Sequence, residues 1–71
     1  MSITIGKLSQ ATAVNVETIR YYERSGVLPR ARRTDSGRRL YGDTDVRRLG
    51  FIRHARRLGF ELDAIRTLLA L

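Results

Sequence analysis

The sequence is poor in the residues that build disulfides, metal sites and membrane spans. It has no cysteine, one histidine and one proline among its 71 residues. The lack of cysteine excludes disulfide frameworks, thiolate nucleophiles and cysteine-ligated zinc, and it favours the cytoplasm over secretion. The longest apolar run, Leu68–Leu71, is too short to cross a bilayer, and no signal-peptide pattern is present. We therefore expect a cytoplasmic chain with no membrane contact and no cofactor of its own.

Acidic residues are also scarce, and the resulting charge is the strongest compositional signal. The 14 basic residues outnumber the 7 acidic ones and give a formal net charge of +7. All basic residues except Lys7 are arginines. An apolar content of 42% argues against a disordered basic tail. The composition therefore predicts one small folded domain that binds a polyanion.

Catalytic motifs are missing as well. The chain has no glycine-rich phosphate loop and no cysteine nucleophile, and its single histidine, His54, has no recognisable serine and aspartate partners. A metal site at His54 would need further ligands, which are only scattered carboxylates here. We expect His54 to be structural or on the surface, and we expect no enzyme activity.

The first third of the chain predicts two short helices. Thr4 is a suitable N-cap for a first helix whose apolar stripe includes Leu8 and which ends near residue 12 or 13. Asn15 is a suitable N-cap for a second helix over Val16–Ser25, and Gly26 is a stop signal after it. Two helices joined by so tight a turn indicate a helix-turn-helix, whose second helix enters the major groove of DNA.

The periodicity of the second helix predicts which side faces outward. At about 100° per residue, its apolar side chains gather on one side. This core side comprises Val16, Ile19 and Tyr22. The exposed side comprises Glu17, Tyr21 and Arg24, flanked by Thr18 and Arg20.

The middle of the chain predicts a small hairpin. Asp35–Gly37 has the composition of a tight turn, and it lies between possible strands over residues 32–34 and 38–41. An isolated two-stranded ribbon is only marginally stable, so we expect this one to pack against the helices. Its arginines repel one another unless something neutralises them, which is typical of a DNA-binding wing. These are Arg30, Arg32, Arg33, Arg38 and Arg39.

The last third predicts two more helices. Asp43 and Asp45 suit the positive end of a third helix, which has an apolar stripe and is ended by Gly59. A fourth helix runs from about Leu62 to the end of the chain. Its exposed terminal leucines indicate either a longer protein or an interface covered by another chain, and we favour the longer protein.

These residues together resemble the N-terminal DNA-binding domain of the MerR family of bacterial transcription regulators. The resemblance covers nearly all of residues 1–71, and the last matching block is most similar to the heavy-metal-responsive branch. The matching blocks are Ile5–Leu8, Val14–Glu23, Gly26–Pro29, Arg33–Gly37, Arg39–Tyr41 and Phe51–Phe60.

The resemblance implies a mainly helical fold, a winged helix-turn-helix with about four helices and a two-stranded hairpin. It implies a longer protein that adds a dimerisation helix and an effector segment beyond residue 71. Such a homodimer binds a palindromic element in double-stranded promoter DNA and distorts it, and so affects RNA polymerase through the promoter. The effector is not defined by these residues, although the resemblance points to a metal ion.

Three positions depart from the family pattern. Arg38 stands where an aromatic residue often follows the wing glycine, so a charge contact to DNA replaces a stacking contact. Ala13 stands where a glycine commonly closes the first helix, at a cost of roughly 1 kcal/mol if the backbone is left-handed. Glu61 replaces the usual serine or threonine N-cap of the fourth helix and is a weaker cap.

The predicted DNA contacts fall into two groups. Glu17, Thr18 and Arg20 are placed to read base edges. Tyr21, Arg33, Arg38, Arg39 and Tyr41 are placed to grip the sugar-phosphate backbone. Two alternatives stay open, because Arg20 could instead form an ion pair with Glu17 or Glu23, and Glu17 could be only a first-turn helix charge. The arginines of the third helix (Arg47, Arg48, Arg53, Arg56 and Arg57) are expected to be solvated.

Two other functions compete with a promoter-binding regulator. One is a free-standing architectural DNA-binding protein of excisionase type. The other is a basic protein-interaction module that docks through its apolar fourth helix. Steep salt dependence of binding to duplex DNA would reject the second of these.

Overall fold

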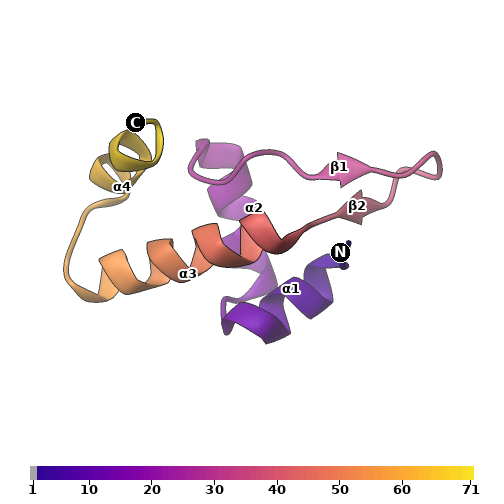
Figure 1. Cartoon of the computed structure of the whole chain (residues 1–71), viewed down its shortest axis with the longest axis horizontal. Coiled ribbons are helices and arrows are strands. Elements are labelled where there is room, and N and C mark those ends of the chain that lie inside the picture. Colours follow the sequence, from indigo (N-terminus) through magenta and orange to yellow (C-terminus); the bar gives the residue numbers. More distant parts are fainter. Residues whose placement is uncertain (1) are drawn as a thin grey trace.

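The computed structural model describes residues 2–71, which form four helices and one short hairpin. In chain order these are α1 (Ile5–Thr12), α2 (Val16–Ser25), β1 (Arg32–Arg33), β2 (Arg39–Leu40), α3 (Asp43–Arg57) and α4 (Leu62–Leu69). Helix α1 packs against both α2 and α3, and α4 packs against α3. Figure 1 shows the hairpin extending from one end of the molecule while α4 lies at the other. The predicted winged helix-turn-helix is confirmed.

One apolar cluster joins all four helices. Leu8 of α1, Ile19 of α2, Leu49 and Ile52 of α3, and Ile65 of α4 are completely buried in it. Burying a side chain of this size contributes about 1.5–3 kcal/mol relative to leaving it exposed. The apolar stripes predicted for the separate helices therefore meet in a single core. None of the helices in the described residues is long and apolar enough to span a bilayer.

The capping residues predicted from the sequence begin α1 and α2. The Thr4 hydroxyl accepts a hydrogen bond from the backbone N–H of Lys7 at 3.3 Å, and Asn15 Oδ1 accepts one from the N–H of Glu17 at 2.8 Å. Gly26 ends α2 in the left-handed conformation, with φ of 82°. These contacts satisfy backbone groups that a helix end leaves without partners.

The two later helices differ in how well they are capped. At the start of α3, Asp45 Oδ2 accepts a hydrogen bond from the N–H of Gly42 at 2.9 Å. At the start of α4, the Glu61 side chain makes no capping hydrogen bond, as expected for a poor cap. Helix α4 ends at Leu69 rather than running on to the last residue.

The hairpin is shorter than the sequence predicts. Each strand has two residues, with Arg32 opposite Leu40 and Arg33 opposite Arg39. A tight turn closes it, in which the N–H of Thr34 donates to the Arg38 carbonyl at 2.8 Å. Two residues expected at strand ends lie outside the strands. Thr34 belongs to the turn, and Tyr41 pairs with Ile3 instead of with β1.

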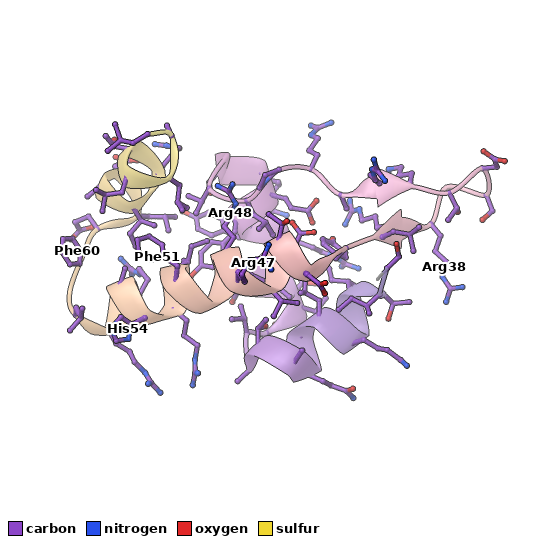
Figure 2. All side chains as sticks on the ribbon, in the orientation of Figure 1. Arg38, Arg47, Arg48, Phe51, His54 and Phe60 are labelled. Atoms are coloured by element: carbon purple, nitrogen blue, oxygen red, sulfur yellow. The ribbon has the colours of Figure 1, made fainter. Side chains whose placement is uncertain are left out.

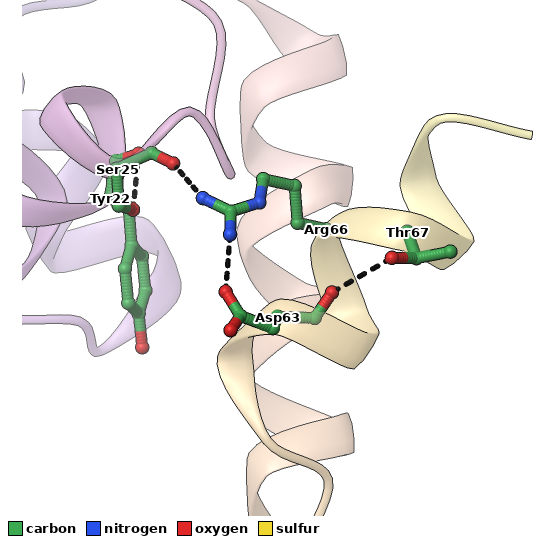
Figure 3. A network of polar contacts seen from close by, with 5 residues as sticks. All are labelled: Tyr22, Ser25, Asp63, Arg66 and Thr67. Atoms are coloured by element: carbon green, nitrogen blue, oxygen red, sulfur yellow. Dashed lines mark hydrogen bonds and ion pairs between the residues drawn. The ribbon is translucent and has the colours of Figure 1, made fainter.

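A side-chain bridge connects α4 to the end of α2. Figure 3 shows the Arg66 guanidinium donating to the backbone carbonyl of Ser25 and pairing with Asp63 on its own helix. The Thr67 hydroxyl in turn donates to the Asp63 carbonyl at 3.1 Å. Because Ser25 is the last residue of α2, Arg66 satisfies a carbonyl at the negative end of that helix.

Ala13, which stands where the resembled family commonly has a glycine, adopts the left-handed conformation. Its φ is 58°, and it is the only non-glycine with positive φ among the described residues. An alanine Cβ is disfavoured there, because it crowds the carbonyl oxygen. The turn between α1 and α2 therefore carries local backbone strain.

We expect Ala13→Gly to stabilise the domain by about 1 kcal/mol, less the extra entropy that glycine gives the unfolded chain. One kcal/mol corresponds to a rise in Tm of about 4–8 °C in a domain of this size, so the net rise is smaller than that. Thermal unfolding followed by circular dichroism measures it. Ala11→Gly, in the last turn of α1 where the backbone is right-handed, is the matched control and should destabilise. Equal destabilisation by both changes would contradict strain at residue 13.

Candidate nucleic-acid interface

The outward side of α2 carries the residues predicted to read bases. Glu17, Arg20, Tyr21 and Arg24 are exposed, with half of Tyr21 accessible, while Ile19 on the opposite side is completely buried. Thr18 is only half-buried and lies at one edge of this surface. The helical periodicity of the sequence therefore placed each of these side chains correctly.

Arg20 and Glu17 form an ion pair on this side of α2. Arg20 Nη1 lies 3.0 Å from Glu17 Oε1, and the side chains are 45% and 75% exposed, respectively. Exposed pairs of this kind contribute about 0–1 kcal/mol, so a phosphate or base edge can replace the partner at little cost. The alternative of an Arg20–Glu17 pair is therefore correct for the structure and compatible with DNA contact by both residues.

Arginines from α2 and from the hairpin line one cleft of about 270 Å³. Arg20 and Arg24 enter it from the helix, and Arg30, Arg33 and Arg39 enter it from the hairpin side. A second cleft shares Arg20, Arg33 and Arg39 and adds Arg38. We call this continuous set the arginine surface: Arg20, Arg24, Arg30, Arg33, Arg38 and Arg39.

The hairpin end of the arginine surface has an internal brace. Arg33 Nη1 donates to the Gly37 carbonyl at 2.9 Å, which holds the tip of the turn while leaving other guanidinium N–H groups free. Figure 2 shows the Arg38 side chain extending away from the ribbon. The fork-shaped guanidinium of an arginine at the tip suits a phosphate oxygen.

Tyr41 is not part of this surface, and its predicted role as a backbone contact is wrong. Its side chain is 2% exposed and belongs to the core. Its hydroxyl donates to Glu23 Oε1 at 2.6 Å, and its backbone pairs with Ile3. The sequence predicts Tyr41 at the end of a strand, where its side chain could face either solvent or the core. In the structure it faces the core.

Two arginines of the surface were not among the predicted site residues. Arg24 follows Arg20 by one helical turn, so its spacing on the exposed side of α2 was a usable signal. Arg30 lies in the segment before β1, and nothing in the local sequence shows that this segment folds back beside α2. Its place depends on tertiary packing.

The arginines of α3 form a separate group. Four of them are exposed, as expected: Arg47, Arg53, Arg56 and Arg57. Arg48 is not fully solvated, because its side chain is half-buried and its Nε atom is buried without a hydrogen-bond partner. Arg53, Arg56 and Arg57 line a shallow cleft together with Thr18 and Asn15. His54 is also exposed, on the side of α3 seen in Figure 2. Within residues 2–71, no three histidine, cysteine or acidic side chains come close enough to hold a metal ion.

The fold and the arginine surface define the class of the chain as a winged helix-turn-helix domain with a cationic binding face. Residues 3–71 match the family model described as MerR HTH family regulatory protein. The chain therefore belongs to the MerR family and forms its winged helix-turn-helix DNA-binding domain.

Individual relatives agree with this assignment. The chain is 49% identical over 67 residues to the HTH-type transcriptional regulator ZntR of Escherichia coli strain K12, covering 94% of this chain and 48% of the relative. The solved structure of PbrR691 from Ralstonia metallidurans CH34 in complex with lead(II) is 40% identical, with a TM-score of 0.89, over 96% of this chain and 53% of that one. The solved structure of HiNmlR, a MerR family regulator lacking the sensor domain and bound to promoter DNA, is 26% identical, with a TM-score of 0.88, over 96% and 52%.

The chain thus spans about half the length of the relatives that it matches. Mercuric resistance operon regulatory proteins are also among its relatives. The predicted resemblance to the heavy-metal-responsive branch is confirmed.

The hydroxyl of Tyr41 has an altered acidity. Burial raises the pKa of Tyr41 well above its ordinary value of 10.0, the Glu23 carboxylate raises it further, and Arg39 opposes the rise. A hydroxyl in this setting stays protonated and keeps donating to Glu23.

We expect the free energy of unfolding to fall as the pH rises above about 10, because the unfolded chain releases the Tyr41 proton first. The stabilising contribution is complete below that pH and declines above it, by at most about 1.4 kcal/mol per pH unit. Urea unfolding over a series of alkaline pH values measures the slope. Tyr41→Phe should make the profile flatter, and an unchanged slope in that variant would assign the effect to other groups.

Proposed function

We propose that this domain binds double-stranded promoter DNA with α2 in the major groove and the hairpin over the adjacent sugar-phosphate backbone. The observation that carries the proposal is the arginine surface, which combines cations from α2 and from the hairpin on one side of the molecule. A surface of this kind releases the counterions of a duplex when it binds.

The proposed roles follow from position and chemistry. Glu17, Thr18 and Arg20 contact base edges, with the Glu17 carboxylate accepting from a cytosine amino group and Arg20 donating to guanine. The backbone contacts are Tyr21, Arg33, Arg38 and Arg39, joined by Arg24 and Arg30. Thr18 contributes its methyl or hydroxyl group from the edge of the surface.

For the whole protein we propose a homodimer that places one α2 in each half of a palindromic promoter element. An effector then changes how the dimer distorts the promoter, which alters the access of RNA polymerase. DNA distortion costs a few kcal/mol, which is comparable to the coupling free energy that an effector supplies. The lead(II) complex of one relative supports a heavy-metal ion as the class of effector.

We also propose a cytoplasmic location and no catalytic role. The support is that the relatives are named as transcriptional regulators, and that DNA contact by a bacterial regulator takes place in the cytoplasm.

We expect Arg38→Ala to weaken binding to every duplex and to lower the slope of log affinity against log salt by about 1, because one phosphate contact is lost. Fluorescence anisotropy with a labelled duplex over a salt series measures both quantities. Arg47→Ala is the control, because it removes the same charge from α3 outside the arginine surface. A slope that does not differ between Arg38→Ala and Arg47→Ala would reject the phosphate contact.

We expect Glu17→Ala to change the preferred base at one position in each half-site, since the carboxylate no longer selects a cytosine amino group. Selection from a pool of random duplexes, followed by sequencing, reads the preference directly. Glu61→Ala is the control, because it removes an equal charge at the start of α4. Recovery of the wild-type site by the Glu17 variant would reduce Glu17 to a charge at the end of a helix.

A further inference from the structure

One carboxylate on α2 accepts hydrogen bonds from both ends of the hairpin. Glu23 Oε1 accepts the hydrogen bond from the Tyr41 hydroxyl at 2.6 Å, and Glu23 Oε2 accepts one from the backbone N–H of Ala31 at 3.1 Å. Ala31 immediately precedes β1, and Tyr41 immediately follows β2. Glu23 therefore joins the helix to the point where the chain enters the hairpin and to the point where it leaves.

Tyr41 extends this junction to the start of the chain. Its backbone N–H donates to the Ile3 carbonyl at 2.9 Å, and its carbonyl accepts from the Ile3 N–H at 2.8 Å. The Tyr41 ring is buried in the core at the same time. The base of the hairpin is thus held by a side chain from α2, by the segment before α1 and by core packing.

The hairpin beyond this base has little else to orient it. Its strands have two residues each, β1 is exposed along its whole length, and an isolated ribbon of this size is marginally stable. The direction in which Arg33, Arg38 and Arg39 point relative to α2 consequently depends on the junction at Glu23.

Glu23 is also the single acidic residue lining the first cleft of the arginine surface. A carboxylate there repels phosphates, so on electrostatic grounds alone its removal should strengthen DNA binding. If instead the carboxylate orients the hairpin, its removal should weaken binding. The two roles predict changes of opposite sign.

We propose that Glu23 and Tyr41 are positioning residues, which fix the hairpin relative to α2 so that both contact the same duplex. The proposal rests on the DNA-binding function proposed above. Neither residue touches DNA in this scheme, and each acts through the arginines of the hairpin, which are Arg33, Arg38 and Arg39. Without the junction, the hairpin must be ordered when DNA binds, and the entropy of that ordering reduces the affinity.

Two substitutions test the junction without removing bulk. Glu23→Gln replaces one acceptor oxygen with a donor amide, so it can satisfy only one of the two donors that face it. Tyr41→Phe removes only the hydroxyl. We expect each to weaken binding of the 71-residue chain to a duplex by about tenfold, the scale of one hydrogen bond to a charged group. The controls are Glu61→Gln, which removes an equal charge, and Tyr22→Phe, whose hydroxyl makes no hydrogen bond within the described residues.

A double-mutant cycle separates positioning from a general loss of stability. Arg38→Ala should weaken binding less in the Tyr41→Phe background than in the wild type, because a misplaced hairpin already contributes less. Additive effects would overturn the proposal, as would tighter binding by Glu23→Gln. Affinities are measured well below the Tm of each variant, which circular dichroism establishes.

A measurement on the free protein keeps the two proposals distinguishable. Residual dipolar couplings of the hairpin amides, compared with those of α2, report whether the two elements keep a fixed orientation. We expect averaging of the hairpin couplings in Tyr41→Phe and not in Tyr22→Phe. Unchanged couplings would overturn the positioning role even if DNA binds. Absence of duplex binding by the wild-type chain would instead reject the proposed function, and the couplings would then report only that the junction fixes the hairpin in the free protein.

Discussion

The complete burial of Ile19 is the constraint on which the surface of this domain depends. A rotation of α2 about its own axis would bring Ile19 into water and lose its contacts with the core that also contains Leu8 and Leu49. The helix is therefore fixed in rotation, and Glu17 and Arg20 must face outward. A small core can orient a reading surface because each helix has only one apolar stripe to bury.

The helices and their outward sides could be predicted from the sequence because their causes are local. The hydroxyl of Thr4 and the amide of Asn15 bond to backbone groups two or three residues away, and Gly26 ends its helix through its own conformation. Periodicity and capping act over a few residues, so a linear sequence records them.

The hairpin and its junction with α2 could not be predicted in this way. Tyr41 and Glu23 are 18 positions apart, and nothing in either local sequence shows that they meet. Tyr41 lies at the end of a predicted strand, where the local sequence allows an inward or an outward side chain, and tertiary contacts with the core, Ile3 and Glu23 decide between them. Arg30 joins the arginine surface for the same reason, because its position follows from the return of the chain beside α2.

The facing of Arg33 and Arg39 across the hairpin has a consequence for the thermodynamics of the free domain. Like charges directly opposite each other in a ribbon of two-residue strands push the strands apart, and the net charge of +7 adds to this self-repulsion. A duplex brings phosphates to the same place and acts as the counterion that the fold does not supply internally. Binding and folding are then linked, so that the bound duplex stabilises the hairpin that contacts it.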